Sequence, residues 1–272
     1  MMEKSFFSSQ LFVHNMEKTL SSLLPSDHDS RPYLYSLLPP GKLFRPKLVY
    51  ALAKDLTSPD LFSCYEKDFF HLALSLEVHH TYTLIHDDLP CMDNDEVRRG
   101  RPTLHMVFDE WHALLAGDAL LNVSFGLLAK LPPSCLPQLL HYYSWATGPK
   151  GLIKGQVLDL QKDSNTTLLH ELKTARLMQL ALVGTALILQ EEKKFTLRDF
   201  KILHRLGQRI GLLFQLADDL DDIKNEKESA NAFQRNPEEA QKKMDDVKKD
   251  LEKIFREKKL PQLELFTMSF FT

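Results

Sequence analysis

The chain has 272 residues and a formal net charge of −3, and 43% of its residues are hydrophobic. This composition supplies enough apolar side chains for a buried core, and the weakly acidic balance excludes the basic face that nucleic-acid binding needs. Only 10 residues are glycine, about half the usual share. The stretch Phe69–Asp88 lacks the glycine and proline breaks that are typical of strands and turns. The chain is therefore expected to be all-α.

Composition also bears on the cellular compartment. The three cysteines, Cys64, Cys91 and Cys135, stand far apart and match no zinc-site spacing. An odd and sparse count of this kind favours a reducing cytoplasm. Met1–Leu11 lacks a basic region followed by an apolar stretch, so no signal peptide is expected. No run of 18 apolar residues is present, so no membrane span is expected either.

Apolar periodicity predicts a series of helices within a single domain, residues 1–272. The predicted helices are Ser8–Leu24, Phe44–Leu56, Lys67–Asp88, Asp109–Lys130, Leu136–Thr147, Leu168–Gln190, Leu197–Ile223 and Pro237–Lys258. From about residue 224 a divergent tail is dominated by Lys, Glu, Asp and Asn, which predicts a solvated and partly mobile helix. The apolar end, Phe266–Thr272, is expected to dock on the body of the protein.

Five carboxylates crowd into a short segment directly after an apolar helix: Asp87, Asp88, Asp93, Asp95 and Glu96. Carboxylates this close repel one another unless cations neutralise them, and oxygen ligands suit Mg²⁺, Ca²⁺ or Mn²⁺. Arg98 and Arg99 follow at once, and arginine binds phosphate through paired hydrogen bonds. The segment predicts a metal–diphosphate site. The alternative is an acidic surface turn; an EF-hand is disfavoured because its glycine and alternating ligands are missing.

Helical geometry relates these residues to their neighbours. At about 100° per residue, His80 projects within about 20° of Asp87, and Thr83 within about 40°. Asp93 projects about 120° from Asp87, so the two can share a side only if the helix bulges or ends between them. Pro90 is the obvious place for that break.

A second acidic cluster, Asp218–Asp222, comes late in another helix. Asp218 and Asp222 are four residues apart and reach the same side. Gly207, Gly211, Phe214 and Gln215 share that side, which we interpret as a groove face and not a packing face. The alternative, a solvated acidic helix end, would oppose the helix dipole without any gain. Two aspartate-rich helix ends that face each other could hold magnesium around a diphosphate.

Several ordered motifs over roughly residues 10–223 resemble those of the trans-isoprenyl diphosphate synthases, the farnesyl and geranylgeranyl diphosphate synthases. They are GKLFRP at Gly41–Pro46, DDLPCMD at Asp87–Asp93, Arg98–His105, Gly117–Leu120, GQVLD at Gly155–Asp159, Lys173–Thr174 and FQLADDLDD at Phe214–Asp222. The resemblance implies the all-α isoprenoid synthase fold, usually a homodimer. It also implies condensation of isopentenyl diphosphate with dimethylallyl or geranyl diphosphate, without nucleic acid or a membrane span.

The resemblance further implies a role for each matching residue. Magnesium, three ions per site, would be bound by Asp87, Asp88, Asp93, Asp218 and Asp222. The allylic diphosphate would be held by Arg98, Lys173, Thr174 and Gln215. Isopentenyl diphosphate would be held by Lys42, Arg45, His80 and Arg99, and Gln156 and Asp159 would line the site near the metals. Among these, Asp87, Asp88, Asp93, Arg98, Lys173 and Asp218 would act in catalysis.

Product length depends on where the growing chain meets a bulky side chain. In the family that this chain resembles, the residues four and five positions before the first aspartate often form the floor of the product tunnel. Here these residues are Thr83 and Tyr82. An aromatic ring at Tyr82 favours farnesyl diphosphate (C15). On an ideal helix Tyr82 projects about 140° from Asp87, so its ring could point away from the tunnel unless the helix is distorted near Pro90. The segment Leu89–Asn94 closely resembles geranylgeranyl-producing members, so C20 is the alternative.

Two departures from the family pattern leave further alternatives open. Leu43 stands where members usually have a basic residue, and residues 225–236 lack the expected lysine-containing loop, for which Lys224 or Lys227 could substitute. The shortened tail favours a non-catalytic subunit of a heteromeric synthase, although both aspartate motifs are present. A class I terpene cyclase would not need Gly41–Pro46 and would usually replace the second aspartate motif.

Overall fold

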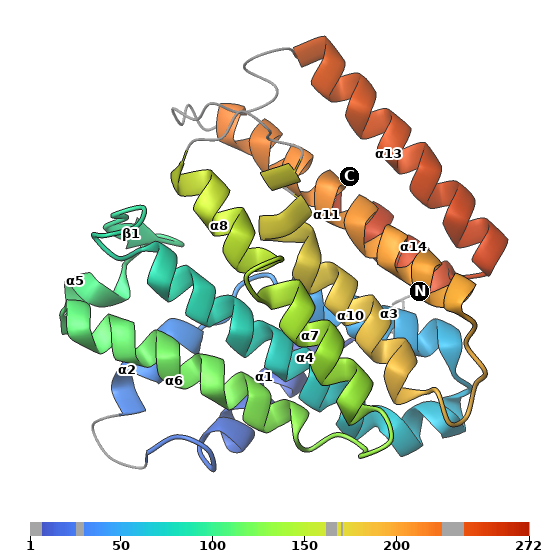
Figure 1. Cartoon of the computed structure of the whole chain (residues 1–272), viewed down its shortest axis with the longest axis horizontal. Helices are drawn as coiled ribbons and strands as arrows, with labels where there is room; N and C mark the ends of the chain where they lie inside the picture. Colours follow the sequence, from blue (N-terminus) through green and yellow to red (C-terminus); the bar gives the residue numbers. More distant parts are fainter. Residues whose placement is uncertain (1–6, 26–29, 162–167, 170, 225–236, 272) are drawn as a thin grey trace.

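The computed structural model describes residues 7–25, 30–161, 168–169, 171–224 and 237–271, and the all-α prediction is confirmed (Figure 1). The helices are α1 (Ser9–Leu20), α2 (Arg31–Leu37), α3 (Phe44–Leu56), α4 (Pro59–Asp87), α5 (Leu104–Phe108), α6 (Glu110–Leu128), α7 (Leu136–Thr147), α8 (Leu152–Leu160), the π-helix η2 (Glu171–Ala175), α10 (Arg176–Ile188), α11 (Leu197–Lys224), α13 (Pro237–Lys258) and α14 (Pro261–Phe270). Among the described residues the only strands form one hairpin, β1 (Val97–Arg98) with β2 (Arg101–Pro102).

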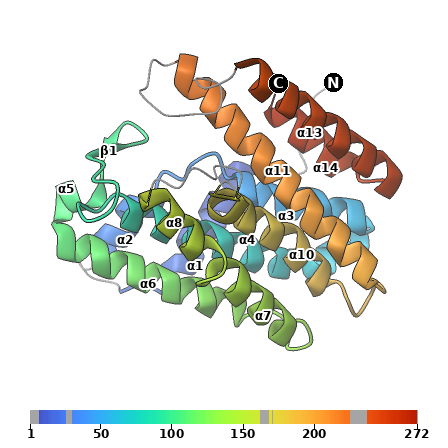
Figure 2. The same cartoon turned by 45° about the horizontal axis from the view of Figure 1, so that its top comes forward.

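Helix α4 is the centre of the bundle, in contact with α3, α6 and α10 (Figures 1 and 2). It begins at Ser58, whose hydroxyl accepts the Leu61 N–H at 3.3 Å, and Pro59 occupies its first turn. These are strong helix-start signals. The helix buries side chains around most of its circumference from Phe69 onward, as a core helix must. It therefore carries its last residue, Asp87, out of the core to one end of the bundle.

Most predicted helices are present, with some changed bounds. Three match the sequence-based bounds: Phe44–Leu56, Leu136–Thr147 and Pro237–Lys258. Helix α4 starts eight residues earlier than predicted, at Pro59 instead of Lys67, because the Ser58 cap lies further upstream. The predicted helix 168–190 instead contains the π turn η2 before α10. Helices α2, α5, α8 and α14 were not predicted.

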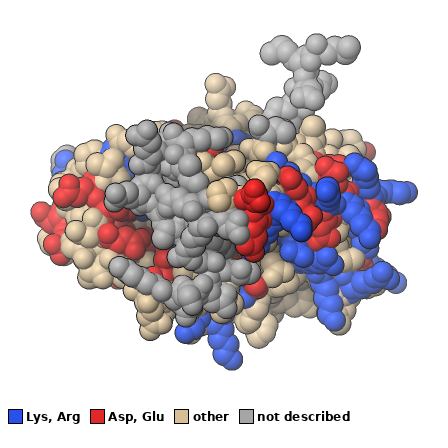
Figure 3. Space-filling view, turned by 90° about the horizontal axis from the view of Figure 1, so that it is seen from above, with Lys and Arg blue, Asp and Glu red and all other residues tan. Residues whose placement is uncertain are grey.

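The C-terminal helices pack against the body of the protein. Helix α13 contacts α11 through a narrow apolar stripe, and Figure 3 shows basic and acidic side chains interleaved over its outer side. Helix α14 lies on α3: the Asp55 carboxylate accepts the N–H groups of Gln262 and Leu263, both at 2.9 Å, and Phe270 contacts Phe44 with ring centroids 4.5 Å apart. The apolar end of the chain thus docks on α3.

The glycine-bearing side of α11 is a packing face, so the predicted groove face is wrong at these positions. A Cβ at Gly207 would lie 2.5 Å from Gln179 Cα, and one at Gly211 would lie 2.5 Å from Ala175 Cα. The glycines therefore let α11 approach η2 and α10 closely. The groove begins only one turn later, at Phe214 and Asp218.

Helix α6 combines a core contact with an exposed apolar side. Within the described residues it is the one helix long and apolar enough, by length and composition alone, to cross a membrane. Core helices of other proteins pass the same test, and α6 makes extensive contacts along α4. Its outward side carries Trp111, Leu114 and Leu115, which are 58%, 47% and 53% exposed.

Candidate active site

A cavity of about 490 Å³ is lined by basic residues from three parts of the chain. Its lining residues are Gly41, Lys42, Leu43, Phe44, Arg45, Glu77, His80, Leu84, Arg98, Arg99, Phe214 and Asp218. The residues predicted for isopentenyl diphosphate, Lys42, Arg45, His80 and Arg99, thus lie together. Asp218 of the second acidic cluster lies beside them.

The start of α3 places two of these cations. Leu43 adopts a left-handed conformation (φ 52°) immediately before α3 begins at Phe44, which turns Lys42 and Arg45 to the cavity. Gly41 lies against the Arg99 guanidinium: a Cβ there would be 2.6 Å from Nη2. A side chain at residue 41 would therefore displace Arg99.

The hairpin after α4 places the two arginines. Arg99 and Gly100, the central residues of its two-residue turn, both have positive φ, 55° and 73°. Two such residues are the requirement of a type I′ turn, which matches the twist of the strands. Arg98 Nε donates to Asp88 at 2.5 Å and its Nη2 to Asp95 at 3.0 Å. The tight turn thus directs Arg98 to the carboxylates, while Arg99 lines the cavity.

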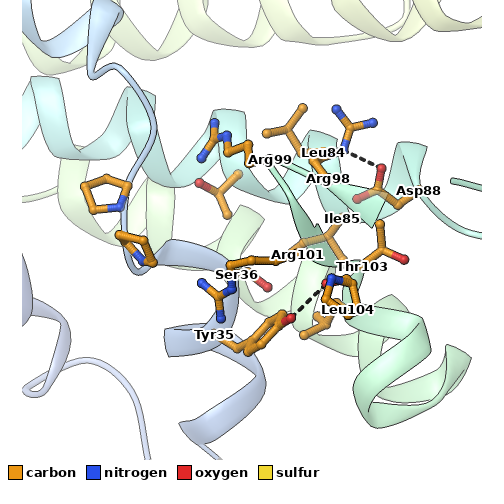
Figure 4. A pocket seen from close by; sticks show the side chains of 14 residues that line it. Tyr35, Ser36, Leu84, Ile85, Asp88, Arg98, Arg99, Arg101, Thr103 and Leu104 are labelled. Carbon is orange, nitrogen blue, oxygen red and sulfur yellow. Dashed lines mark hydrogen bonds and ion pairs between the residues drawn. The ribbon is translucent and has the colours of Figure 1, made fainter. Parts of the chain in front are cut away.

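A second cavity, of about 270 Å³, lies beneath the hairpin next to α2 and α4 (Figure 4). Figure 4 shows Arg98 paired with Asp88, whereas Arg99 extends toward the opposite side. Tyr35 donates its hydroxyl to the Pro102 carbonyl at 2.8 Å, and Arg101 donates to the Leu38 carbonyl at 2.8 Å. These bonds tie the hairpin to the α2 region and so fix the position of both arginines.

The first acidic cluster forms where α4 ends. The helix stops at Asp87, before Pro90, and the Asp93 N–H donates to the Asp87 carbonyl at 2.9 Å, so the chain folds back on itself as predicted. Burial raises the pKa of Asp87 to about 6; Lys173 opposes this shift and Asp93 adds to it. Burial likewise raises the pKa of Asp88 and of Asp93. Crowded carboxylates of this kind are a fit environment for a cation.

The residues predicted for the allylic diphosphate lie across from this cluster. Lys173 Nζ lies 2.5 Å from Asp159 and 3.7 Å from Asp87. Burial alone would lower the pKa of Lys173, but Asp87 and Asp159 outweigh it and raise the pKa above its ordinary value. Thr174 donates to Gln215 Oε1 at 3.1 Å. Lys173 therefore joins the first acidic cluster to α8, and Thr174 joins η2 to α11.

The remaining predicted residues have different surroundings. Gln156 is buried in α8, and its amide nitrogen has no hydrogen-bond partner among the described residues. Asp222 lies in α11, but its side chain is outside the described part of the structure, as are the side chain of Lys224 and all of Lys227.

Tyr82 is 8% exposed and lies edge-on to His79 and His86, with ring centroids 4.6 and 5.7 Å apart. It lines neither of the two cavities described above.

The donor set fits magnesium that is shared with a phosphate ligand. Among the residues that the structure describes, no three His, Cys, Asp or Glu side chains converge to hold a metal by themselves. Mg²⁺ does not require such a cage, because it usually keeps several waters and binds through one or two carboxylates plus phosphate oxygens. Asp87, Asp88 and Asp93, where like charges repel one another, provide those carboxylates.

The structure adds Glu77, which the sequence analysis missed. Glu77 is 3% exposed and lines the 490 Å³ cavity, where it opposes Arg45 and Arg99. Burial raises the pKa of Glu77, and burial lowers the pKa of Arg45 to about 10. The signal was available, because Glu77 precedes His80 by three residues and shares its side of α4.

The fold and this site define a helical isoprenoid synthase, and three comparisons with known proteins agree. The polyprenyl synthetase family profile matches residues 28–236. The chain is 38% identical over 215 residues to farnesyl diphosphate synthase of Micrococcus luteus, which covers 74% of this chain and 70% of the relative. It is 40% identical over 201 residues to geranylgeranyl pyrophosphate synthase 7 of Arabidopsis thaliana, which covers 70% and 55%.

Solved structures give the same result along the whole chain. The geranyltransferase of Helicobacter pylori matches with a TM-score of 0.81 and 34% identity, covering 98% of this chain and 100% of that one. A second structure from that organism, complexed with magnesium and isoprenyl diphosphate, matches with a TM-score of 0.81 and 31% identity, covering 100% and 99%. The chain belongs to the polyprenyl synthetase family. It is a short-chain trans-prenyltransferase similar to farnesyl diphosphate synthases, which confirms the predicted fold and enzyme class.

Close packing of α8 on η2 gives a first prediction. A Cβ at Gly155 would lie 2.6 Å from the Lys173 backbone nitrogen and 2.9 Å from the Leu172 carbonyl carbon. We expect Gly155→Ala to lower the free energy of unfolding by about 1–3 kcal/mol, because backbone atoms cannot move aside as a flexible side chain can. Urea denaturation measures this change.

The matched control is Gly126→Ala in α6, where an added Cβ would meet nothing within 4 Å. That change should leave stability unaltered or raise it by up to about 1 kcal/mol, since alanine favours a helix over glycine. A Gly155→Ala protein as stable as the wild type would contradict the close packing.

Proposed function

We propose that this chain joins isopentenyl diphosphate to dimethylallyl or geranyl diphosphate and releases mainly farnesyl diphosphate. One observation carries the proposal: a carboxylate cluster at Asp87–Asp93 adjoins a cavity lined by Lys42, Arg45 and Arg99, with Arg98 contacting both. The first is suited to a metal-bound diphosphate and the second to a diphosphate without metal. Two diphosphate subsites side by side are what this condensation needs.

The allylic subsite is assigned to the acidic side. Asp87, Asp88 and Asp93, with Asp218 and Asp222 of α11, would hold three magnesium ions. Bound magnesium supplies Lewis-acid stabilisation of the departing pyrophosphate. Arg98, Lys173, Thr174 and Gln215 would hold the allylic diphosphate, and Gln156 and Asp159 would line this side near the metals. Lys173, which already bridges Asp87 and Asp159, adds fixed positive charge where negative charge develops.

The isopentenyl subsite is assigned to the cavity. Arg45 keeps its charge at neutral pH even though burial lowers its pKa to about 10. Burial and the nearby Arg45 and Arg99 lower the pKa of His80 well below its usual value, so His80 is neutral and can donate one ring N–H. With Lys42 and Arg99 these groups would fix the diphosphate and orient the double bond toward the allylic carbon.

The reaction then needs no protein nucleophile. The allylic C–O bond breaks, the electron pair of the isopentenyl double bond attacks the cation, and a proton leaves to the released pyrophosphate. The chain's own residues hold the two diphosphates and exclude water from the cation. A non-catalytic subunit with the same fold would lack turnover when it is purified alone.

Kinetics with each substrate varied test these two assignments on the purified chain with Mg²⁺. Asp87→Ala should lower kcat by roughly a thousandfold, several kcal/mol, because it removes stabilisation of the departing pyrophosphate. Arg45→Ala should raise KM for isopentenyl diphosphate by at least about tenfold, since a charged hydrogen bond is lost, and leave KM for the allylic substrate nearly unchanged. Turnover of Asp87→Ala near that of the wild type, or equal effects of Arg45→Ala on both substrates, would refute the assignment.

The product assignment rests on Tyr82, five residues before Asp87. Its buried ring lies edge-on to His79, which lies edge-on to Tyr143, so the three rings form an edge-to-face cluster between α4 and α7. Such an aromatic cluster would stop chain growth early and favour C15. C20 remains the alternative, since geranylgeranyl as well as farnesyl diphosphate synthases are similar to this chain.

Chromatography of the products from a Tyr82→Ala enzyme tests whether Tyr82 limits the length of the product. Removing the ring should shift the product from C15 to C20 or longer, because the cavity left by a large buried aromatic ring admits another isoprene unit. Tyr82→Phe is the control, since it keeps the ring and should keep C15. An unchanged product from Tyr82→Ala would place the floor elsewhere.

We also propose a cytoplasmic homodimer. The exposed apolar residues Trp111, Leu114 and Leu115 lie on one side of α6, and Phe125 extends that side. An exposed apolar side of this kind is typical of a subunit interface. The three cysteines are free thiols, which fits a reducing compartment.

Light scattering tests the dimer. Leu115→Glu should shift the protein from dimer to monomer, because a buried charge without a partner opposes association. Leu265→Glu on α14, a residue 49% exposed away from this surface, is the matched control and should remain dimeric. A wild-type protein that is monomeric at micromolar concentration would contradict the proposed homodimer.

A further inference from the structure

The π turn η2 (Glu171–Ala175) presents the two residues that are assigned above to the allylic diphosphate, Lys173 and Thr174. A π turn is rare because its hydrogen bonds run from residue i to i+5 and widen the helix, and such turns are frequent at functional sites. The turn therefore requires support from its surroundings. That support comes from the residue directly after it, Arg176.

Arg176 closes an ion pair across the π turn. Its Nη2 lies 3.4 Å from Glu171 Oε1, five residues earlier in the chain. In a regular α-helix, residues five apart project about 140° from each other and do not meet. The extra residue of a π turn brings them to the same side. The Glu171–Arg176 pair is thus compatible with the π turn and not with a regular α-helix.

Two further contacts hold the Arg176 guanidinium, which belongs to a residue that is 6% exposed. Its Nη1 donates to Gln179 Oε1 at 3.0 Å, and its central carbon lies 4.3 Å from the centre of the Trp145 ring on α7. Gln179 in turn lies 3.2 Å from His204 Nε2 on α11. A buried arginine with these contacts has a fixed position, and it anchors η2 to α7, α10 and α11.

The opposite side of the turn faces the site. Gly155 of α8 and Gly211 of α11 allow close contact with Leu172–Lys173 and with Ala175. There Lys173 lies 2.5 Å from Asp159, and Thr174 donates to Gln215 at 3.1 Å. Lys173 and Thr174 thus point to the site, while the Glu171–Arg176 pair reaches Trp145.

We propose that Arg176 is a positioning residue that holds the π turn and so directs Lys173 and Thr174 at the allylic diphosphate. Arg176 touches no substrate in this arrangement and acts through the backbone of η2. The proposal rests on the function proposed above, which assigns the allylic diphosphate to these two residues. Loss of Arg176 should therefore affect the allylic subsite and not the isopentenyl subsite, because η2 contributes no residue to the cavity assigned to isopentenyl diphosphate.

Steady-state kinetics of three variants test the proposal. Arg176→Met should raise KM for the allylic diphosphate by about tenfold or more, because a small misplacement of a substrate-binding group has a large kinetic effect. KM for isopentenyl diphosphate should stay within about twofold of wild type, since that subsite holds no η2 residue. Arg176→Lys should recover part of the loss. Glu171→Gln, which leaves the buried arginine in place, should shift the same KM in the same direction.

The control is Arg205→Met, which removes an exposed arginine of α11 that pairs with Asp250 of α13. It should leave both KM values unchanged. Equal rises of both KM values in Arg176→Met, or no rise in either Arg176→Met or Glu171→Gln, would overturn the proposal.

Hydrogen exchange gives a readout that is independent of activity. Amides of residues 171–176 should exchange faster in Arg176→Met than in Arg205→Met under identical conditions, while those of α3 should not differ. Unchanged exchange across η2 would overturn the positioning role. A wild-type chain without turnover would refute the proposed function alone, and the exchange result would still decide whether Arg176 holds the turn.

Discussion

Repulsion among the carboxylates at the end of α4 is the constraint around which the site is arranged. Burial raises the pKa of Asp87 to about 6, and the neighbouring Asp93 and Asp88 carboxylates add to this rise. Lys173 at 3.7 Å and Arg98, paired with Asp88 at 2.5 Å, relieve the repulsion only in part. Both cations come from elements that follow α4 in the chain. The hairpin and the π turn thus each place a cation beside the end of α4, where it compensates part of the negative charge.

The neighbouring cavity has the opposite charge imbalance, because basic residues predominate in its lining. Arg45 is buried there with Arg99 close by, and its charge is opposed by Glu77 and Asp218. Each side of the site therefore carries charge that a ligand would balance. The acidic side needs a cation, and the basic side needs an anion. The magnesium–diphosphate complex proposed above would supply both, which would explain why an acidic side and a basic side adjoin in one site.

The sequence predicted the parts of the structure that local patterns control. Helix α13 was predicted with its observed bounds, and in the structure it begins at Pro237 and ends just before Lys259, which has a positive φ. Helices α2 and α5, of 7 and 5 residues, are too short for periodicity to reveal them. The π turn was not predictable, because it depends on Trp145 and on glycines that lie far away in the chain. Gly207 and Gly211 were misread for the same reason: a glycine permits close packing as readily as it opens a groove.

Most residues of the candidate site were predicted from the family resemblance of their motifs, and helix geometry adds a local reason for those on α4. The motifs recur at fixed spacing, and His80, Asp87 and Glu77 share one side of a helix that the sequence clearly defines. The acidic clusters also lie near the C-terminal ends of α4 and α11, where the helix dipole disfavours negative charge by roughly 0.3–1 kcal/mol for each charge. A fold that needed only stability would not retain aspartates at both ends. Because the cost is local and visible in the sequence, it identifies the site even before the partners of each carboxylate are known.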